Sequence, residues 1–397
     1  MNPYRWFLLG CLALAWSACA PIPPSRHADH PWTTPAHWRT PAFTSGPRTG
    51  CVEEIFYEGP SFQGKPTRVF AYLGRPATSG IGRSPAMVLV HGGGGKAFRD
   101  WAEHWAKRGY VALAMDLAGN GPAGRLPEGG PDQADATKFR NFTEAEVGEM
   151  WTYHAVANVL RGHSLLRSLP DVDPDRIGLT GISWGGYLTC LVASIDHRFQ
   201  VAVPVYGCGF LGDNSVWKDG SLAGMAPDSR ERWLRRFDPS QYLDDVRCPI
   251  LFLNGTTDFA YPLDSYQKSY RLVPGQLRHL AIVTNLPHGH IWTFGEVDAF
   301  VDHRLRGTAP LARPGALIRE GDLLRTRVVS KVPLKSASLC YTSDVGPWNQ
   351  RRWVSAPARL EGSMVTSMLP AVRPLVAYLA MVDDRGLRVS TDFVEIP

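Results

Sequence analysis

The feature that most constrains the fold is a series of short, continuously apolar segments separated by stretches with helical spacing. The apolar segments are residues 86–90, 110–115, 201–205, 250–253 and 280–283. Strands that are apolar on both sides are typical of a parallel sheet with helices on both faces. The helical patterns are at residues 101–108, 144–169, 188–193 and 298–305. This alternation predicts an α/β protein with a doubly wound, mostly parallel sheet.

The regions on either side of this alternation predict β-structure. Residues 52–57 and 67–73 predict two strands, with turns at Gly59-Pro60 and at Gly64. After about residue 307, short segments such as 323–329, 338–341 and 375–381 alternate with Gly, Pro and polar turns. This pattern of short segments and turns predicts a small all-β sandwich. We therefore expect a main α/β domain over residues 51–307 and a β-sandwich-like domain over residues 316–397.

The N-terminus has the pattern of an export signal. Arg5 precedes an apolar run at residues 6–15 that is too short to span a membrane. Small residues before Cys19 resemble a bacterial lipobox, although Trp16 stands where an aliphatic residue is usual. We predict a signal peptide over residues 1–18 and lipidation of Cys19, which would anchor a periplasmic protein to the cell envelope. Ordinary cleavage after a small residue is the alternative. Residues 19–50, rich in Pro, Ser, Thr and His, are expected to form a tether or extended arm.

A glycine-flanked serine is the strongest chemical signal. Residues 181–185 read Gly-Ile-Ser-Trp-Gly, between a predicted strand at 176–180 and a predicted helix at 188–193. A strand–turn–helix of this kind is so tight that glycine is needed two residues on either side of the serine. The helix N-terminus favours the negative charge that develops during acyl transfer. We therefore predict that Ser183 is a nucleophile.

A second glycine motif predicts an oxyanion hole. His91 is followed by four glycines, residues 92–95, directly after the apolar segment that ends at Val90. Glycines allow backbone amides to approach a substrate oxygen closely. We expect the amides of Gly93 and Trp184 to form the hole. No Gly-Lys-Ser/Thr sequence follows these glycines, so they do not match the motif of a phosphate-binding loop.

These two motifs resemble those of the α/β-hydrolase superfamily, over about residues 51–307. Residues 90–94 and 181–187 are similar to the branch that contains dienelactone hydrolases, acetylxylan esterases and prolyl oligopeptidase catalytic domains. The double glycine after Trp184 is closer to the peptidases, and acetylxylan esterases typically have glutamine where Trp184 stands. The resemblance implies a Ser-Asp-His triad in that chain order.

The acid and the base should follow later strands. A serine hydroxyl needs a base, and the base needs an orienting acid. Asp258 lies in the loop after residues 250–253, whereas Asp264 falls in the next helical segment and is the weaker candidate. His288 and His290 both lie in the loop after residues 280–283. The histidine spacing of the acetylxylan-esterase branch, counted from Leu280, favours His288.

We expect an exported serine carboxylic-ester hydrolase that acts through an acyl-enzyme on short, acetyl-like esters. Trp184 and Trp217 could line a sugar platform, so carbohydrate esters are one expected substrate class. A peptidase of the prolyl oligopeptidase type without its propeller, or a non-catalytic binding protein on this scaffold, are the alternatives. Only about 30 residues separate the predicted signal from the first strand, which favours the esterase. The insertion at residues 207–236 is expected to shape the pocket.

The composition of the chain limits the classes of partner and cofactor that we expect. The net charge of +5 is carried by scattered lysines and arginines, which predicts no nucleic-acid partner. No cluster of metal ligands is visible, and the expected chemistry needs no cofactor. The cysteines are widely spaced and suggest neither a zinc site nor a redox pair.

Overall fold

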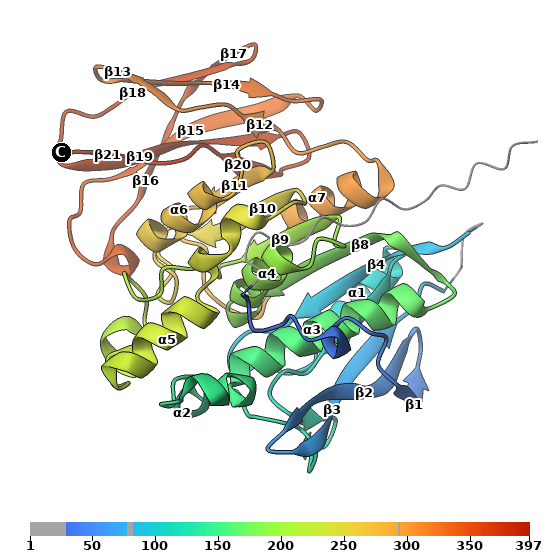
Figure 1. Ribbon diagram of the computed structural model, residues 1–397. Coiled ribbons are helices and arrows are strands. Elements are labelled where there is room, and N and C mark those ends of the chain that lie inside the picture. The colour runs from blue at the N-terminus through green and yellow to red at the C-terminus, as the bar shows by residue number, and fades with distance from the viewer. Residues whose placement is uncertain (1–28, 78–81, 293) are drawn as a thin grey trace, which may run out of the picture.

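The structure is a computed structural model that describes residues 29–77, 82–292 and 294–397. The predicted signal peptide and Cys19 lie outside the described residues. Figure 1 shows an α/β domain with a β-rich C-terminal domain beside it. In the part of the chain that the structure describes, no helix has the length and apolar character needed to cross a membrane.

A nine-stranded sheet forms the centre of the main domain, in the order β1-β2-β3-β5-β4-β8-β9-β10-β11. From β5 to β11 every neighbouring pair is parallel, whereas β1, β2 and β3 join antiparallel at one side. The strands are β1 (Phe43–Thr49), β2 (Val52–Phe62), β3 (Lys65–Gly74), β4 (Ser84–Val90), β5 (Val111–Met115), β8 (Val172–Ile182), β9 (Val201–Val205), β10 (Ile250–Gly255) and β11 (Arg278–Val283). The predicted mostly parallel, doubly wound sheet is confirmed.

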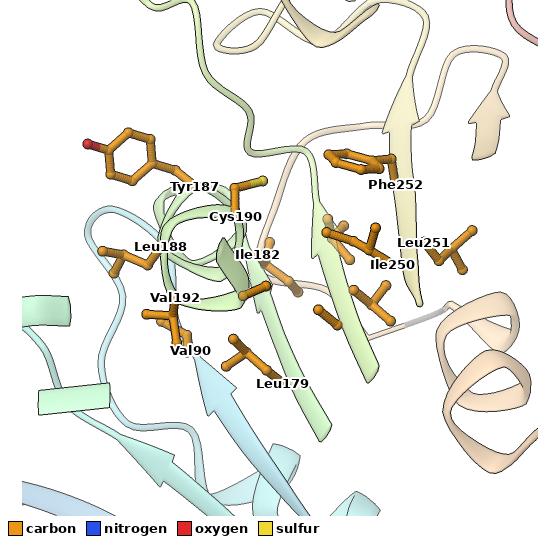
Figure 2. Close-up of a cluster of buried hydrophobic side chains, with 14 of the residues drawn as sticks. Val90, Leu179, Ile182, Tyr187, Leu188, Cys190, Val192, Ile250, Leu251 and Phe252 are labelled. Carbon is orange, nitrogen blue, oxygen red and sulfur yellow. The ribbon is translucent and has the colours of Figure 1, made fainter. Parts of the chain in front are cut away.

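Helices cover both faces of this sheet (Figure 1). The long helices are α1 (Arg99–Lys107), α3 (Trp151–Ser168), α4 (Trp184–Ile195), α5 (Pro227–Phe237), α6 (Leu263–Leu272) and α7 (Gly295–Arg306). Helices α1 and α7 are joined by a hydrogen bond between His104 Nε2 and Asp298 Oδ1 at 3.0 Å. Figure 2 shows buried apolar side chains of β4, β8, β10 and α4 around the junction of β8 with α4. The junction of β8 with α4 is therefore embedded in the hydrophobic core.

Some predicted details are wrong. Gly59 and Pro60 lie inside β2 and form no turn, and the chain reverses only around Gly64. The pairing of β2 with β3 shifts register between Gly59 and Phe62, and such a bulge tolerates a proline without an N–H. The predicted helix at 144–169 begins as a 3₁₀ segment, Glu144–Glu149, and becomes α-helical only at Trp151.

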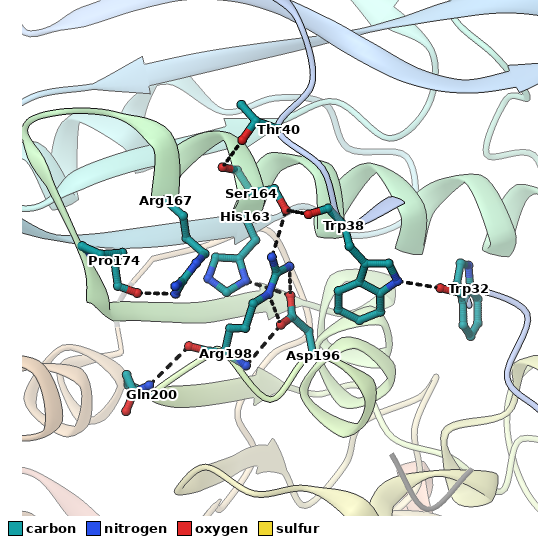
Figure 3. A network of polar contacts seen from close by, with 10 residues as sticks. All are labelled: Trp32, Trp38, Thr40, His163, Ser164, Arg167, Pro174, Asp196, Arg198 and Gln200. Carbon is teal, nitrogen blue, oxygen red and sulfur yellow. Dashed lines mark hydrogen bonds and ion pairs between the residues drawn. The ribbon is translucent and has the colours of Figure 1, made fainter. Parts of the chain in front are cut away.

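The described part of the predicted tether, residues 29–50, packs on the main domain. The Trp32 side chain is fully buried and its indole nitrogen donates a hydrogen bond to the Tyr153 carbonyl at 2.9 Å. The Trp38 indole donates to the Trp32 carbonyl, and Ser164 Oγ donates to the Trp38 carbonyl at 3.0 Å (Figure 3). The following strand, β1, extends the sheet. Buried aromatic side chains thus make this segment an extended arm and not a free tether.

A buried ionic network lies beside this arm (Figure 3). His163 Nδ1 is 2.8 Å from Asp196 Oδ2, and Arg198 pairs with the same carboxylate at 2.7 Å. Arg198 also donates to Ser164 Oγ at 3.0 Å. Burial lowers the pKa of His163 to about 4, so this imidazole is neutral near pH 7.

The C-terminal domain consists of two antiparallel sheets, as the sequence predicts. One sheet has the order β12-β14-β18-β17 with β13 on β14, and the other has β16-β15-β19-β20 with β21 on β19. Their strands are β12 (Arg313–Pro314), β13 (Ile318–Glu320), β14 (Leu323–Val329), β15 (Leu334–Thr342), β16 (Val354–Pro357), β17 (Arg359–Glu361), β18 (Met364–Met368), β19 (Leu375–Asp383), β20 (Arg388–Ser390) and β21 (Val394–Ile396). Strand β20 lies along β11, where Ser390 Oγ accepts a hydrogen bond from the Ile282 amide at 2.9 Å.

Candidate active site

Ser183 occupies a strained turn between β8 and α4. Its backbone has φ 61° and ψ −119°, a conformation that non-glycine residues seldom adopt. A Cβ on Gly181 would lie 2.3 Å from the Gly185 carbonyl oxygen, and one on Gly185 would lie 2.1 Å from the Val90 carbonyl oxygen. Glycine is therefore obligatory at both positions. The turn presents the serine at the N-terminus of α4, as the motif predicts.

His288 bridges Ser183 and Asp258. His288 Nε2 is 2.8 Å from Ser183 Oγ, and His288 Nδ1 is 2.6 Å from Asp258 Oδ2. The amides of Ala260 and Tyr261 donate to Asp258 Oδ1 at 2.9 and 2.7 Å and fix the carboxylate. A proton on Nδ1 then points at Asp258, which leaves Nε2 free to accept the serine proton.

The two other candidates lie elsewhere. Asp264, at the start of α6, accepts two hydrogen bonds from Asn214 Nδ2 and has none with either histidine of the loop. His290 has no hydrogen bond with Ser183 or Asp258 and instead accepts one from the Gly92 amide at 2.9 Å. The structure thus brings Asp258 and His288 together with Ser183, and their catalytic roles stay a prediction.

Aromatic rings surround the His288 imidazole. Tyr206 stacks on it with ring centroids 4.4 Å apart, and its hydroxyl donates to the Pro287 carbonyl at 2.8 Å. Phe259 lies on another side at 4.9 Å and is half exposed. Tyr206 is not among the residues predicted from the sequence, although it directly follows β9, where sheets of this kind place functional residues.

The glycine loop after β4 offers two free amides. Gly92 donates to His290 Nε2, and the Gly95 amide donates to the Gly92 carbonyl at 3.2 Å. Within the described residues the amides of Gly93 and Gly94 have no acceptor. A Cβ on Gly93 would lie 2.8 Å from Trp184 Cδ1, so Gly93 and Trp184 are immediate neighbours. The amide of Trp184 is in the first turn of α4, where helix geometry supplies no acceptor.

His290 and His91 hold this loop from two sides. The His290 ring packs against Phe98, with centroids 5.1 Å apart, and burial together with the neighbouring His91 lowers its pKa. His290 is therefore neutral near pH 7, with Nε2 as an acceptor. His91 Nδ1 donates to the Gly92 carbonyl at 2.7 Å, and its Nε2 accepts from the Leu117 amide at 2.8 Å. No sequence pattern indicates the bonds of His290 to Gly92 and of His91 to Leu117, because these partners are far apart in the chain.

Ser183 and His288 open into a cavity of about 710 Å³. Its apolar wall includes Trp184 and Trp217, whose ring centroids are 4.5 Å apart. These residues are only 2% and 7% exposed, so little of either indole is open to a ligand. Trp217 comes from the predicted insertion, which includes a π-helical turn, Lys218–Leu222, and α5.

A second group of residues that line the cavity is polar, and its charges are balanced. Its side chains are Asn120, Arg125, Asp132, Gln133, Asp135 and Lys138. The Lys138 ammonium is 2.8 Å from Asp135 Oδ1 and donates to the Gln133 carbonyl at 3.0 Å. Burial lowers the pKa of Lys138. The Gln133 amide group is buried and has no hydrogen-bond partner among the described residues.

Comparisons with known proteins identify the family of the main domain. The family model of the dienelactone hydrolase family matches residues 69–275, which include Ser183 and Asp258. The uncharacterized peptidase YuxL of Bacillus subtilis is 25% identical over 51% of this chain and 30% of its own length. The acetyl esterase Axe7A of Xylanibacter ruminicola is 22% identical over 58% of this chain and 54% of its own length. This chain therefore spans only part of each of these relatives.

A solved structure supports the fold. Acetyl xylan esterase 1 from Thermoanaerobacterium sp. superposes with a TM-score of 0.51 at 19% identity, over 71% of this chain and 94% of the esterase. The match of the family model covers more than half of the chain. The chain belongs to the dienelactone hydrolase family, a family of α/β-hydrolase fold.

Proposed function

We propose that the protein is a serine carboxylic-ester hydrolase with Ser183 as nucleophile, His288 as general base and Asp258 as the orienting acid. The observation that carries the proposal is the pair of hydrogen bonds on His288, 2.8 Å to Ser183 Oγ and 2.6 Å to Asp258 Oδ2. This is the geometry that general-base activation of a serine requires.

The reaction follows from these positions. His288 Nε2 takes the proton of Ser183 as Oγ attacks the ester carbonyl carbon, and the amides of Gly93 and Trp184 stabilise the resulting oxyanion. His288 then gives the proton to the departing alcohol, which leaves an acyl group on Ser183. A water molecule, deprotonated by the same nitrogen, attacks the acyl-enzyme and releases the acid.

The shape of the cavity favours a short acyl group and a polar alcohol. The Trp184 ring lies against Gly93 and limits the space beside the predicted oxyanion hole. The unpartnered Gln133 amide and the balanced charges of Lys138 and Asp135 suit a neutral, hydroxyl-bearing alcohol such as a carbohydrate. The names of the relatives, an acetyl esterase and an acetyl xylan esterase, agree with such a substrate. Export and lipidation at Cys19 would bring the enzyme to extracytoplasmic polysaccharide.

A peptidase activity is the second candidate, because YuxL is named a peptidase. Amide hydrolysis uses the same triad chemistry, so the comparison of substrates must decide between them. Esters of p-nitrophenol with increasing acyl length, assayed beside aminoacyl-p-nitroanilides, make that comparison.

Replacement of the nucleophile tests the central proposal. Ser183→Ala should lower the turnover of p-nitrophenyl acetate by about 10³-fold or more, because the members of a triad act as a unit. The control is Ser168→Ala, at the end of α3 and remote from the site, which should keep wild-type turnover. Near-normal turnover by purified Ser183→Ala would show that the nucleophile lies elsewhere.

A further inference from the structure

We propose that the C-terminal β-domain is a positioning element of the active site, because it holds both ends of the loop that carries His288. This inference rests on the function proposed above and adds a role for the second domain. The His288 loop is defined here as residues 284–292, between β11 and α7.

The first end of the His288 loop is held by β19 and β15. Thr284 Oγ1 is 3.1 Å from the hydroxyl of Tyr378 and donates to Cys340 Sγ at 3.6 Å. Tyr378 is fully buried, in an apolar cluster that also contains Ile282 of β11. A buried tyrosine hydroxyl needs a partner, so this contact fixes Thr284 against the β-domain.

Helix α7, which follows the His288 loop, is held by the turn into β20. The Arg388 amide donates to Glu296 Oε1 at 2.9 Å, in the first turn of α7. A Cβ on Gly295 would lie 2.9 Å from Leu387 Cδ2, so the β-domain packs directly on the start of this helix. The His288 loop therefore lies between Thr284 and α7, and both of these contact the β-domain.

The helix that follows the Asp258 loop is held by the same domain. Gln267 Nε2 donates to Asp392 Oδ1 at 2.8 Å, and Arg271 Nε donates to Asp392 Oδ2 at 2.9 Å. Leu263, at the first residue of α6, lies in the apolar cluster of Tyr378. The β-domain thus contacts the elements next to both Asp258 and His288.

The position of Ser183 is set differently. Its turn is embedded between β8 and α4, where the Ser183 amide donates to the Val205 carbonyl of β9 at 2.9 Å. The central sheet thus fixes the nucleophile, whereas the loop of the base depends in addition on the β-domain. A small displacement of a catalytic base lowers the chemical rate steeply and leaves binding largely intact.

A double-mutant cycle across the first contact tests the inference. Tyr378→Phe and Thr284→Val should each lower kcat for p-nitrophenyl acetate about 5- to 10-fold, with KM within about twofold, and the double variant should be no worse than the poorer single variant. The rates are expressed per active site, titrated with a fluorophosphonate that labels Ser183. Misfolded protein then cannot mimic the effect.

The second contact supplies a rescue pair. Glu296→Ala removes the acceptor for the Arg388 amide and should lower kcat, whereas Glu296→Gln keeps an acceptor oxygen and should restore most of it. Tyr341→Phe is the matched control, since Tyr341 lies in the same domain and is partly exposed. This control should have wild-type kcat.

Two results would overturn the inference, and they are distinguishable. If the wild type is active and Tyr378→Phe and Thr284→Val both match Tyr341→Phe in kcat per active site, the β-domain does not position the loop, and the proposed function stands. If the wild type neither hydrolyses esters nor reacts with the fluorophosphonate, the proposed function is wrong and the inference fails with it.

Discussion

The bond between His290 and Gly92 allows a quantitative prediction about the oxyanion loop. His290→Phe keeps an aromatic ring beside Phe98 but removes the nitrogen that accepts the Gly92 amide at 2.9 Å. The Gly92 N–H is then buried without a partner, or the loop turns to find one. Either response disturbs the adjacent amide of Gly93.

The size of the effect follows from the cost of the lost hydrogen bond. A buried amide without a partner costs about 1–3 kcal/mol. If the whole cost appears in the transition state, kcat falls by about 5- to 150-fold. His288→Ala removes the base itself and should cost about 10³-fold or more. His288→Ala should therefore lower kcat by at least about 7-fold more than His290→Phe does, although the two histidines are only two residues apart.

Steady-state kinetics of both variants on p-nitrophenyl acetate, normalised by fluorophosphonate titration, measure this difference. His290→Phe should lower kcat with little change in KM, because the oxyanion forms only during the reaction. A His290 variant that loses more activity than His288→Ala would move the base to His290. A His290 variant with wild-type kcat would show that the bond to Gly92 does not support the oxyanion loop.

Three further predictions concern substrate, location and pH. Short acyl p-nitrophenyl esters should be hydrolysed much faster than aminoacyl-p-nitroanilides, and equal or faster anilide turnover would favour a peptidase. Labelled fatty acid should be incorporated in the bacterial host at Cys19 and not in Cys19→Ala, and an unlabelled soluble protein would leave simple secretion. Burial lowers the pKa of His37, His154 and His163 to about 4, so the unfolded chain binds more protons below pH 6.5. As the pH falls below 6.5, the free energy of unfolding should decrease by up to about 1.4 kcal/mol per pH unit for each of these histidines. Equal midpoints of urea unfolding at pH 7 and pH 5 would contradict this prediction.

The sequence predicted the neighbourhood of the site well because each candidate follows the carboxyl end of a buried strand. Ser183 follows β8, Asp258 follows β10 and His288 follows β11. These strands belong to the parallel run β8-β9-β10-β11 at one end of the sheet. Strand ends that share an edge of a parallel sheet bring their loops together. Their proximity could be inferred from local patterns, while the roles of the three side chains stay predictions.

Other features depend on contacts that leave no local pattern. Trp32 lies in a segment of tether-like composition, and only its burial against Tyr153 shows that the segment is packed. The bond of His290 to Gly92 joins two residues that are 198 positions apart in the chain. Gly59-Pro60 was misjudged because both residues favour turns, whereas here a bulge in β2 accommodates them.

The two borders of the large sheet are closed to further strands by different means. At one border β1 carries Pro47, which has no N–H to donate, and its register shifts between Ser45 and Arg48. At the other border Ser390 of the β-domain already accepts the Ile282 amide of β11. A second molecule cannot extend the sheet at the covered border and meets an irregular template at the other. Both features hinder edge-to-edge association between copies of the protein.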